Sequence, residues 1–111
     1  PIRGEYLTNV DEGVRFMLEW AKVNGMSPVG EPIKYSFEIN RIYPELKPGY
    51  SSIQCLKESH ISLHTYPEYN LMHADLFSCK ILKHEVNNAF FDLYFSKYKC
   101  NLVDRSFTID K

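Results

Sequence analysis

The stretch YSSIQCLKESHISLHTYPEY, residues 50–69, decides the fold of this chain. Short runs of β-branched, aromatic and polar residues that end at turn residues are typical of strands. The stretch therefore predicts two strands, Tyr50–Leu56 and His60–Tyr66, followed by a turn at Pro67. Another strand is expected at Leu71–Cys79, and it is apolar enough to be central in a sheet.

Upstream of this stretch the pattern predicts two further strands. The run Ile33–Ile39 alternates apolar with polar residues, which is typical of a strand with one buried face. Residues 4–10 are expected to form the first strand of the chain. The segment between Ile39 and Tyr50 contains Pro44, Pro48 and Gly49, which indicate a loop.

Two segments have helical spacing. The first has apolar residues at i, i+3, i+4 and i+7, namely Val14, Met17, Leu18 and Ala21. Asn9 or Asp11 can cap its start, and Gly25 is well placed to end it. The second helix is expected over residues 83–98, with Val86, Phe90, Leu93 and Tyr94 on one side. A closing strand is expected at Leu102–Ile109.

The predicted order of elements is β-α-β-β-β-β-α-β. It favours an α+β fold of a single domain over residues 1–111, a two-layer α/β sandwich in which an antiparallel sheet carries two helices on one face. The other face of the sheet then needs cover. This arrangement points to a partner subunit and hence to a dimer.

Composition excludes several classes of function. A formal net charge of −1 gives no basic surface for nucleic acid. No apolar run approaches the roughly 20 residues of a membrane span, and residues 1–5 lack the apolar core of a secretion signal. The three cysteines, Cys55, Cys79 and Cys100, are an odd number, which favours a reducing cytoplasm over a disulfide scaffold. Cys55 and Cys100 are expected to serve packing.

Residues 58–69 read ESHISLHTYPEY, and DLFSC follows at residues 75–79. The pattern resembles the bacterial and archaeal S-adenosylmethionine decarboxylase family, whose members make a pyruvoyl cofactor from their own backbone by autocatalytic cleavage. The resemblance implies a zymogen that is cut between Glu58 and Ser59 into chains 1–58 and 59–111. It also implies a lyase that supplies decarboxylated S-adenosylmethionine for spermidine, and so for polyamine biosynthesis.

The same resemblance assigns a role to each motif residue. Ser59 is similar to the pyruvoyl precursor, whose carbonyl forms a Schiff base with the substrate amine. His64 and Ser51 resemble residues that assist processing, and Cys79 resembles the proton donor of decarboxylation. Two further residues match the substrate-binding part of the motif: Glu68, where a family glutamate contacts the substrate ribose, and Tyr66, which replaces a tryptophan.

The chemistry requires a serine that follows a reactive carbonyl. A serine hydroxyl can attack the carbonyl of its own preceding peptide bond, which turns the amide into an ester. Removal of the serine α-proton then eliminates the upstream chain as a carboxylate. The dehydroalanine that remains hydrolyses to a pyruvoyl group and ammonia. These steps need an oxyanion donor and a base, and a strained turn would help the hydroxyl reach the carbonyl.

Strand geometry separates the residues of the motif. Five steps of about 3.3 Å place Ser59 and His64 roughly 16 Å apart, and their odd spacing puts them on opposite faces of one strand. Ser51 lies eight residues before Ser59. We therefore expect two composite sites in a homodimer, with Ser59 and Cys79 from one chain and Ser51 and His64 from its mate.

Other interpretations stay open from the sequence. The N-terminus lacks the family's Gly-x-His opening, and the loop at Ile42–Leu46 departs from its aromatic pattern, so the substrate could be ornithine or arginine. An unprocessed homologue that acts as a partner subunit is a third interpretation. No metal is expected, because His60 and His64 lie about 13 Å apart along a strand, too far for two Zn–N bonds of about 2.0–2.1 Å.

Overall fold

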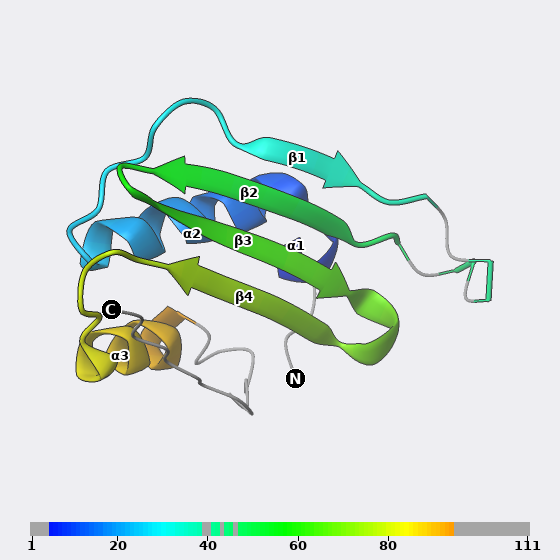
Figure 1. The fold of residues 1–111 in the computed structure, drawn as a ribbon. Helices are drawn as coiled ribbons and strands as arrows, with labels where there is room; N and C mark the ends of the chain where they lie inside the picture. Colours follow the sequence, from blue (N-terminus) through cyan, green and yellow to red (C-terminus); the bar gives the residue numbers. More distant parts are fainter. Residues whose placement is uncertain (1–4, 39–40, 43, 46, 95–111) are drawn as a thin grey trace.

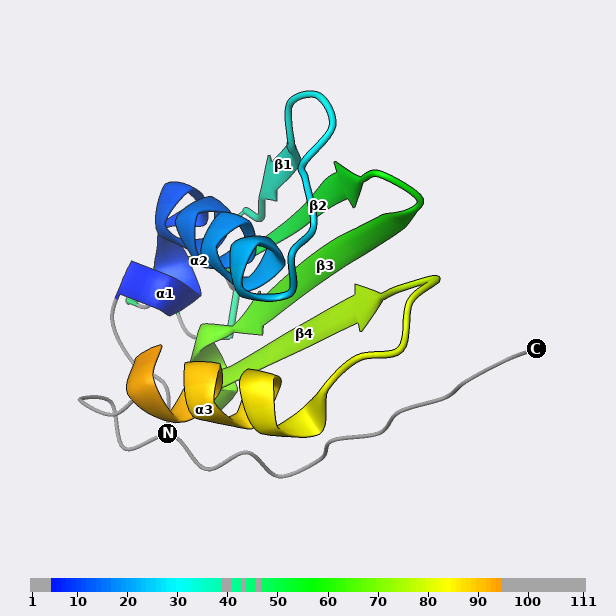
Figure 2. The same cartoon turned by 90° about the vertical axis from the view of Figure 1, so that its left-hand side faces the viewer.

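A four-stranded antiparallel sheet carries the α-helices on one of its faces (Figures 1 and 2). The fold was obtained as a computed structural model, which describes residues 5–38, 41–42, 44–45 and 47–94. The helices are α1 (Glu5–Thr8), α2 (Val10–Val23) and α3 (His84–Tyr94). The strands are β1 (Ile33–Ser36), β2 (Tyr50–Leu56), β3 (Ser59–Tyr66) and β4 (Leu71–Phe77), and the 3-10 turn η1 (Pro67–Tyr69) joins the last two. The predicted α+β class is confirmed.

The strands lie in the order β1-β2-β3-β4, so each one pairs with its neighbour in sequence. The sequence correctly predicted both β2 and β3. The register pairs Ser51 with His64 and Leu56 with Ser59. On the next strand along, His64 pairs with His73. This register fixes which motif residues are neighbours.

Alternation along β2 and β3 separates two faces. The side chains that face the helices are buried, and on β3 they include Ile61, Leu63 and Thr65. On the opposite face none of the described helices covers the strands, as Figure 2 shows. That open face carries Ile53, His60, His64 and Phe77, among others.

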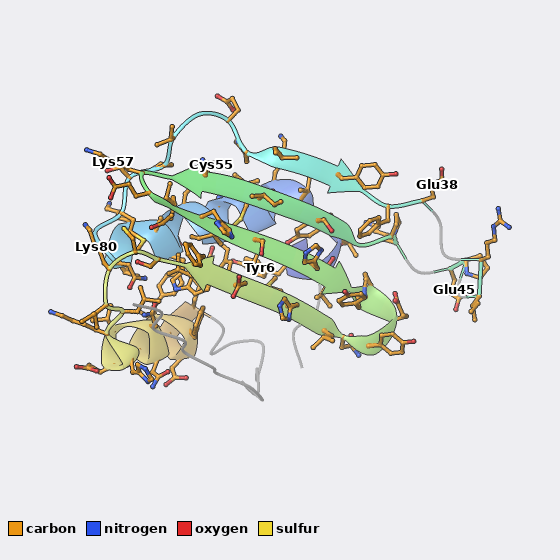
Figure 3. All side chains as sticks on the ribbon, viewed as in Figure 1. Tyr6, Glu38, Glu45, Cys55, Lys57 and Lys80 are labelled. Carbon is orange, nitrogen blue, oxygen red and sulfur yellow. The ribbon has the colours of Figure 1, made fainter. Side chains whose placement is uncertain are left out.

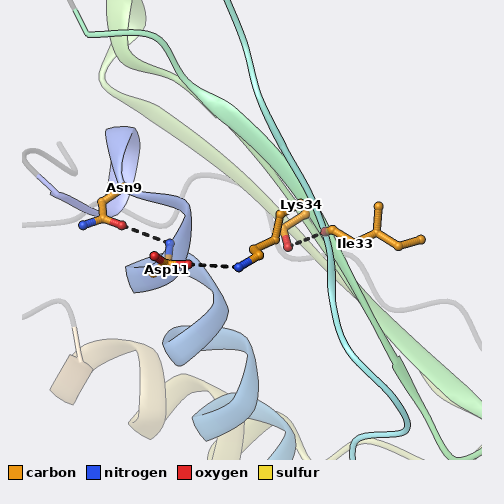
Figure 4. Close-up of polar contacts among 5 residues, drawn as sticks. Asn9, Asp11, Ile33 and Lys34 are labelled. Carbon is orange, nitrogen blue, oxygen red and sulfur yellow. Dashed lines mark hydrogen bonds and ion pairs between the residues drawn. The ribbon is translucent and has the colours of Figure 1, made fainter.

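Helix α2 forms the main cover of the sheet. Its start is capped as predicted, because the Asn9 side chain accepts a hydrogen bond of 3.0 Å from the backbone N–H of Asp11 (Figure 4). The Asp11 carboxylate also lies 3.3 Å from the Lys34 ammonium group on β1. The buried side of α2 includes Phe16, Met17, Trp20 and Ala21. Leu18, predicted to be on this side, is instead 39% exposed.

The predicted strand over residues 4–10 is wrong, because Glu5–Thr8 forms α1 and Val10 already begins α2. Tertiary contacts explain the difference. The carbonyl of Leu7 accepts a hydrogen bond of 2.7 Å from the hydroxyl of Thr65, and the Leu7 side chain is buried in the core. A strand at this position would remove Leu7 from both contacts.

The burial of β1 and the position of β4 in the sheet differ from the prediction. β1 ends at Ser36, and all four of its residues are exposed, so the predicted buried face is wrong. Its apolar residues Ile33 and Tyr35 pair with Ile53 and Ser51, which puts them on the open face. β4 was expected to be central, but among the described residues it is an edge strand with an alternating burial pattern.

Helix α3 packs on α2 through aromatic rings and one polar cluster. Phe16 lies 5.7 Å from Phe90, measured between ring centroids. The buried amide of Asn87 accepts hydrogen bonds from the Trp20 indole N–H, at 2.7 Å, and from the Asn24 amide, at 2.8 Å. Leu93, predicted to be on the packed side, is 81% exposed. The end of the predicted helix and the predicted strand Leu102–Ile109 lie outside the described residues.

Tyr50 anchors the start of β2 beneath the helices. Its hydroxyl donates a hydrogen bond of 2.7 Å to the carbonyl of Tyr6. Burial raises the pKa of the Tyr50 phenol well above its ordinary value. The ring fits because position 13 is glycine, where a Cβ atom would collide with the Tyr50 ring. Within the described part of the chain, no helix is long and apolar enough to cross a membrane.

Candidate active site

The turn between β2 and β3 holds the predicted cleavage position. Lys57 and Glu58 form this turn, and the register places Leu56 opposite Ser59 at its base. Glu58 has a φ of 64°, in the left-handed region that non-glycine residues rarely adopt. This conformation costs roughly 1–2 kcal/mol. The residue that supplies the carbonyl of the predicted scissile bond is therefore strained.

Ser59 lines a small pocket at this end of the sheet. The pocket has a volume of about 270 Å³ and is lined by Gly25, Met26, Ser27, Lys57, Glu58, Ser59 and Lys80. Figure 3 shows Lys57 and Lys80 close together at this end. The first three lining residues follow α2, so the pocket lies between the end of that helix and the turn. Ser59 alternates with Ile61, and it therefore belongs to the residues that face the helices.

Cys79 lies two residues beyond the end of β4 and close to the turn. Its thiol donates a hydrogen bond of 3.6 Å, between Sγ and the Oε2 atom of Glu58. The backbone around it is held by a second contact, because the Ser78 hydroxyl accepts a hydrogen bond of 2.9 Å from the N–H of Lys80. Cys79 is exposed and free of any disulfide.

Ser51 and His64 form a second pair, toward the other end of the same strands. The Ser51 hydroxyl oxygen lies 2.6 Å from Nδ1 of His64. The two residues are direct partners in the β2–β3 register, so backbone pairing sets their proximity. The His73 ring lies next to this pair, with its centroid 6.4 Å from that of His64. All three side chains are on the open face of the sheet.

The four predicted processing and catalytic residues thus form two separate pairs in one chain. Ser59 and Cys79 lie at the turn, whereas Ser51 and His64 lie farther along the strands and on the opposite face from Ser59. The chain does not gather all four in one pocket, the arrangement that would have contradicted a composite site.

A second pocket contains both predicted substrate-binding residues. It has a volume of about 250 Å³ and is lined by Phe37, Glu38, Lys47, Pro48, Gly49, Thr65, Tyr66, Pro67 and Glu68. Figure 3 places Glu38 at the opposite end of the sheet from Lys57. The pocket combines carboxylates with aromatic rings, and Phe37 stacks edge-on against Tyr35 at a centroid distance of 5.4 Å. Glu68 and Tyr66 therefore lie near His64 and far from Ser59.

In the part of the chain that the structure describes, the remaining histidines and cysteines form no further cluster of possible metal ligands. Among the described residues, no group of three His, Cys, Asp or Glu side chains could hold a metal ion. His60 stacks on Phe77 with a centroid distance of 5.4 Å. The packing role expected for Cys55 is wrong in this chain, because Cys55 is exposed on the open face. Cys100 lies outside the described residues.

One contact of the site was missed by sequence reasoning. Glu58 was expected only to precede the cleaved bond, but its side chain also binds the Cys79 thiol. The register between β3 and β4 would have predicted this contact. His60 pairs with Phe77, so an extension of the register by two residues puts Glu58 opposite Cys79.

Comparisons of the sequence with known proteins point to one family. The S-adenosylmethionine decarboxylase family model matches residues 2–105. A proenzyme of that name from Archaeoglobus fulgidus is 36% identical over 63 residues, 56% of this chain and 54% of the relative. One from Thermoplasma acidophilum is 44% identical over 57 residues, 51% of this chain and 41% of the relative. One from Persephonella marina is 38% identical over 69 residues, 61% of this chain and 45% of the relative.

The chain spans about half the length of the curated relatives it matches. No solved structure shows a significant match. The family model, however, covers nearly all of the sequence, including both pairs of site residues and both pockets. On this basis the chain belongs to the S-adenosylmethionine decarboxylase family.

Proposed function

We propose that this chain is the precursor of a pyruvoyl-dependent S-adenosylmethionine decarboxylase and that it cleaves itself between Glu58 and Ser59. The observation that carries the proposal is the left-handed backbone of Glu58, at the tip of a hairpin and directly before Ser59. Strain at this position favours attack on the Glu58 carbonyl, because the attack changes the geometry of the strained peptide. Family membership supports S-adenosylmethionine as substrate over ornithine or arginine.

The processing steps use residues of this chain. The Ser59 hydroxyl attacks the Glu58 carbonyl carbon, and the C–N bond breaks to leave an ester and a free amine at Ser59. A base removes the Ser59 α-proton, and the bond between Cβ of Ser59 and the ester oxygen then breaks, which releases Glu58 as a carboxylate and leaves a dehydroalanine. Hydrolysis of the dehydroalanine gives ammonia and the pyruvoyl group. That group supplies an electron sink for the electrons that carbon dioxide leaves behind.

The residues present fit such a group and its proton transfers. The Cys79 thiol lies at the same turn as Ser59 and can donate a proton to a substrate carbon bound there. The Ser51–His64 pair can hold and move a proton, because its two polar atoms lie 2.6 Å apart. The second pocket offers Glu68 and Tyr66 to a ribose and an adenine ring.

The separation of the two pairs supports a homodimer with composite sites. The Ser59 side chain faces the helices, but the turn that carries it lies at the end of the sheet. A two-fold axis that packs two open faces together can bring this turn to the His64 end of the other copy. The open face also carries exposed apolar side chains that such packing would bury, including Ile33 (64% exposed) and Phe77 (58%). Ser51, His64 and the Glu68 pocket of one copy would then serve Ser59 and Cys79 of its mate.

A denaturing gel with intact mass tests the cleavage. We expect two fragments, residues 1–58 and 59–111, the second without a free amino terminus. The variant Ser59→Ala should stay full length and release no carbon dioxide. Labelled S-adenosylmethionine, ornithine and arginine then test the substrate. A full-length wild-type chain without turnover would contradict the proposal and would favour the unprocessed homologue.

Mixed dimers test the composite site. Copies with Ser59→Ala and copies with His64→Ala are each expected to remain uncut, and they are then unfolded and refolded together. In a composite dimer, the intact His64 of the first copy serves the intact Ser59 of the second. Fragments carrying His64→Ala should therefore appear only in the mixture. If no fragments appear in refolded mixed dimers, His64 and Ser59 do not act across subunits.

Cellular setting and product follow from the same proposal. The two described cysteines are free, which suits a reducing compartment such as the cytoplasm. A decarboxylated S-adenosylmethionine carries the aminopropyl group that spermidine synthesis consumes. We therefore place the enzyme in polyamine biosynthesis, as a single domain over residues 1–111 that is cut into two chains.

A further inference from the structure

The contact between Glu58 and Cys79 lies just beyond the last residues that pair between β3 and β4. The Cys79 thiol donates to the Glu58 carboxylate over 3.6 Å. A thiol is a weak donor, and an ionised carboxylate is the acceptor that strengthens such a bond most. The β3–β4 register ends with His60 and Phe77, so this side-chain contact continues the pairing beyond the last backbone partners.

Each partner is attached to a backbone with its own local constraint. Glu58 is fixed by its left-handed φ of 64° within a two-residue turn. The Cys79 backbone is fixed by the hydrogen bond from Lys80 N–H to the Ser78 hydroxyl. Neither constraint sets the direction of the thiol itself. Cys79 is exposed, and an exposed side chain on a loop can occupy three staggered χ1 positions. In the structure the thiol faces the Glu58 carboxylate.

We propose that the Glu58 side chain is a positioning residue, which holds the Cys79 thiol at the turn beside Ser59. The inference rests on the proposed function, in which Cys79 delivers a proton to a carbon bound at that position. A thiol that rotates away from the turn cannot deliver it. Glu58 thus has two roles: its backbone supplies the scissile carbonyl, and its side chain orients the acid.

Self-cleavage would place Glu58 and Cys79 on separate polypeptides, but it would not have to break the hydrogen bond between their side chains. Glu58 becomes the last residue of the first fragment, and Cys79 belongs to the second. The hydrogen bond then spans the two fragments and keeps the new chain end beside the site. The Glu58 carboxylate therefore can orient Cys79 in the mature enzyme as well as in the precursor.

Infrared spectroscopy of the thiol S–H stretch tests the contact without any catalysis. The chain with Ser59→Ala is used, because it should stay uncut, and the Cys79 band is identified by its loss in Cys79→Ala. We expect Glu58→Ala to move this band to the higher frequency of a thiol without a strong acceptor. Glu58→Gln should move it part of the way, because an amide oxygen still accepts. Glu31→Ala, at an exposed site away from the turn, is the matched control.

The kinetic effect is measured on the fraction of each variant that is cut. We expect Glu58→Ala to lower kcat about 10-fold with KM changed less than 2-fold, because orientation of the proton donor is lost while substrate binding is retained. An unchanged Cys79 band in Glu58→Ala overturns the positioning role, whether or not that variant is cut. Failure of the proposed function would look different: wild type would remain uncut and inactive.

Discussion

The hydroxyl oxygen of Ser51 lies 2.6 Å from Nδ1 of His64, across a register that makes the two residues direct partners on β2 and β3. Backbone pairing, rather than a flexible loop, therefore holds this pair in place. It lies on the open face, whereas Ser59 faces the helices. Under the proposed function, this pair would act on the Ser59 of a second copy.

Loss of the Ser51 hydroxyl should slow self-cleavage. We expect Ser51→Ala to reduce the rate of fragment formation roughly 100-fold, because His64 then has no hydroxyl through which to exchange a proton. The rate is followed on denaturing gels after refolding. Ser62→Ala is the control, since Ser62 lies on the same face of β3 and pairs with Asp75 instead. Equal rates for the two variants would remove Ser51 from the processing machinery.

Substrate affinity should depend on Glu68. We expect Glu68→Gln to raise the KM for S-adenosylmethionine about 10-fold, because a charge-assisted hydrogen bond to a ribose hydroxyl contributes about 1.5 kcal/mol or more. The value of kcat should change little, since Glu68 is proposed to contact the ribose and not the carbon that loses carbon dioxide. Glu31→Gln provides the control outside the pocket. A fall in kcat at constant KM would assign Glu68 to the chemical step.

Alkaline pH should destabilise the fold through Tyr50. Its pKa is raised by burial in the folded state, so the unfolded chain loses this proton first as pH rises above about 10. The free energy of unfolding then falls, by at most about 1.4 kcal/mol per pH unit for this group. Urea titrations at about pH 9 and pH 11 measure the fall. It should be smaller in Tyr50→Phe, and an identical fall would assign it to other groups.

Gly13→Ala should destabilise the protein although alanine favours helices. The added methyl group collides with the Tyr50 ring, and such overpacking costs about 1–3 kcal/mol. Chemical denaturation gives the change in free energy. Lys22→Ala, at an exposed position of the same helix, should stay within about 0.5 kcal/mol of wild type. Unchanged stability in Gly13→Ala would mean that Tyr50 can move at little cost.

Local signals were enough to predict α2, β2 and β3. The Asn9 cap and the apolar spacing define α2, and turn residues bound the two strands. Local signals failed over residues 4–10, where a short helix forms instead of the predicted strand. Hydrogen bonds from the Thr65 hydroxyl to the Leu7 carbonyl and from the Tyr50 hydroxyl to the Tyr6 carbonyl hold this helix in place. Those contacts span more than 40 residues of sequence, so no local pattern contains them.

The alternation of apolar and polar residues in β1 was predicted correctly, but its apolar side chains were expected on the buried face of the sheet. Ile33 and Tyr35 are apolar, yet they face the open side of the sheet and not the helices. A sequence pattern shows that one face of a strand is apolar; it does not show what covers that face. For the site, the motif predicted which residues matter. Only the register showed that Ser51 lies beside His64 and that Glu58 lies beside Cys79.

The β2–β3 ladder has a consequence for the stability of the mature protein. Cleavage at Glu58 would cut the turn and remove the backbone nitrogen of Ser59, but it would leave the other five of the six residue pairs of this ladder, which then hold two separate polypeptides together. Folding of the precursor is unimolecular, whereas reassembly of the fragments would be bimolecular. The melting temperature of the cut protein should therefore rise with protein concentration even within one protomer, and its unfolding should become hard to reverse on dilution.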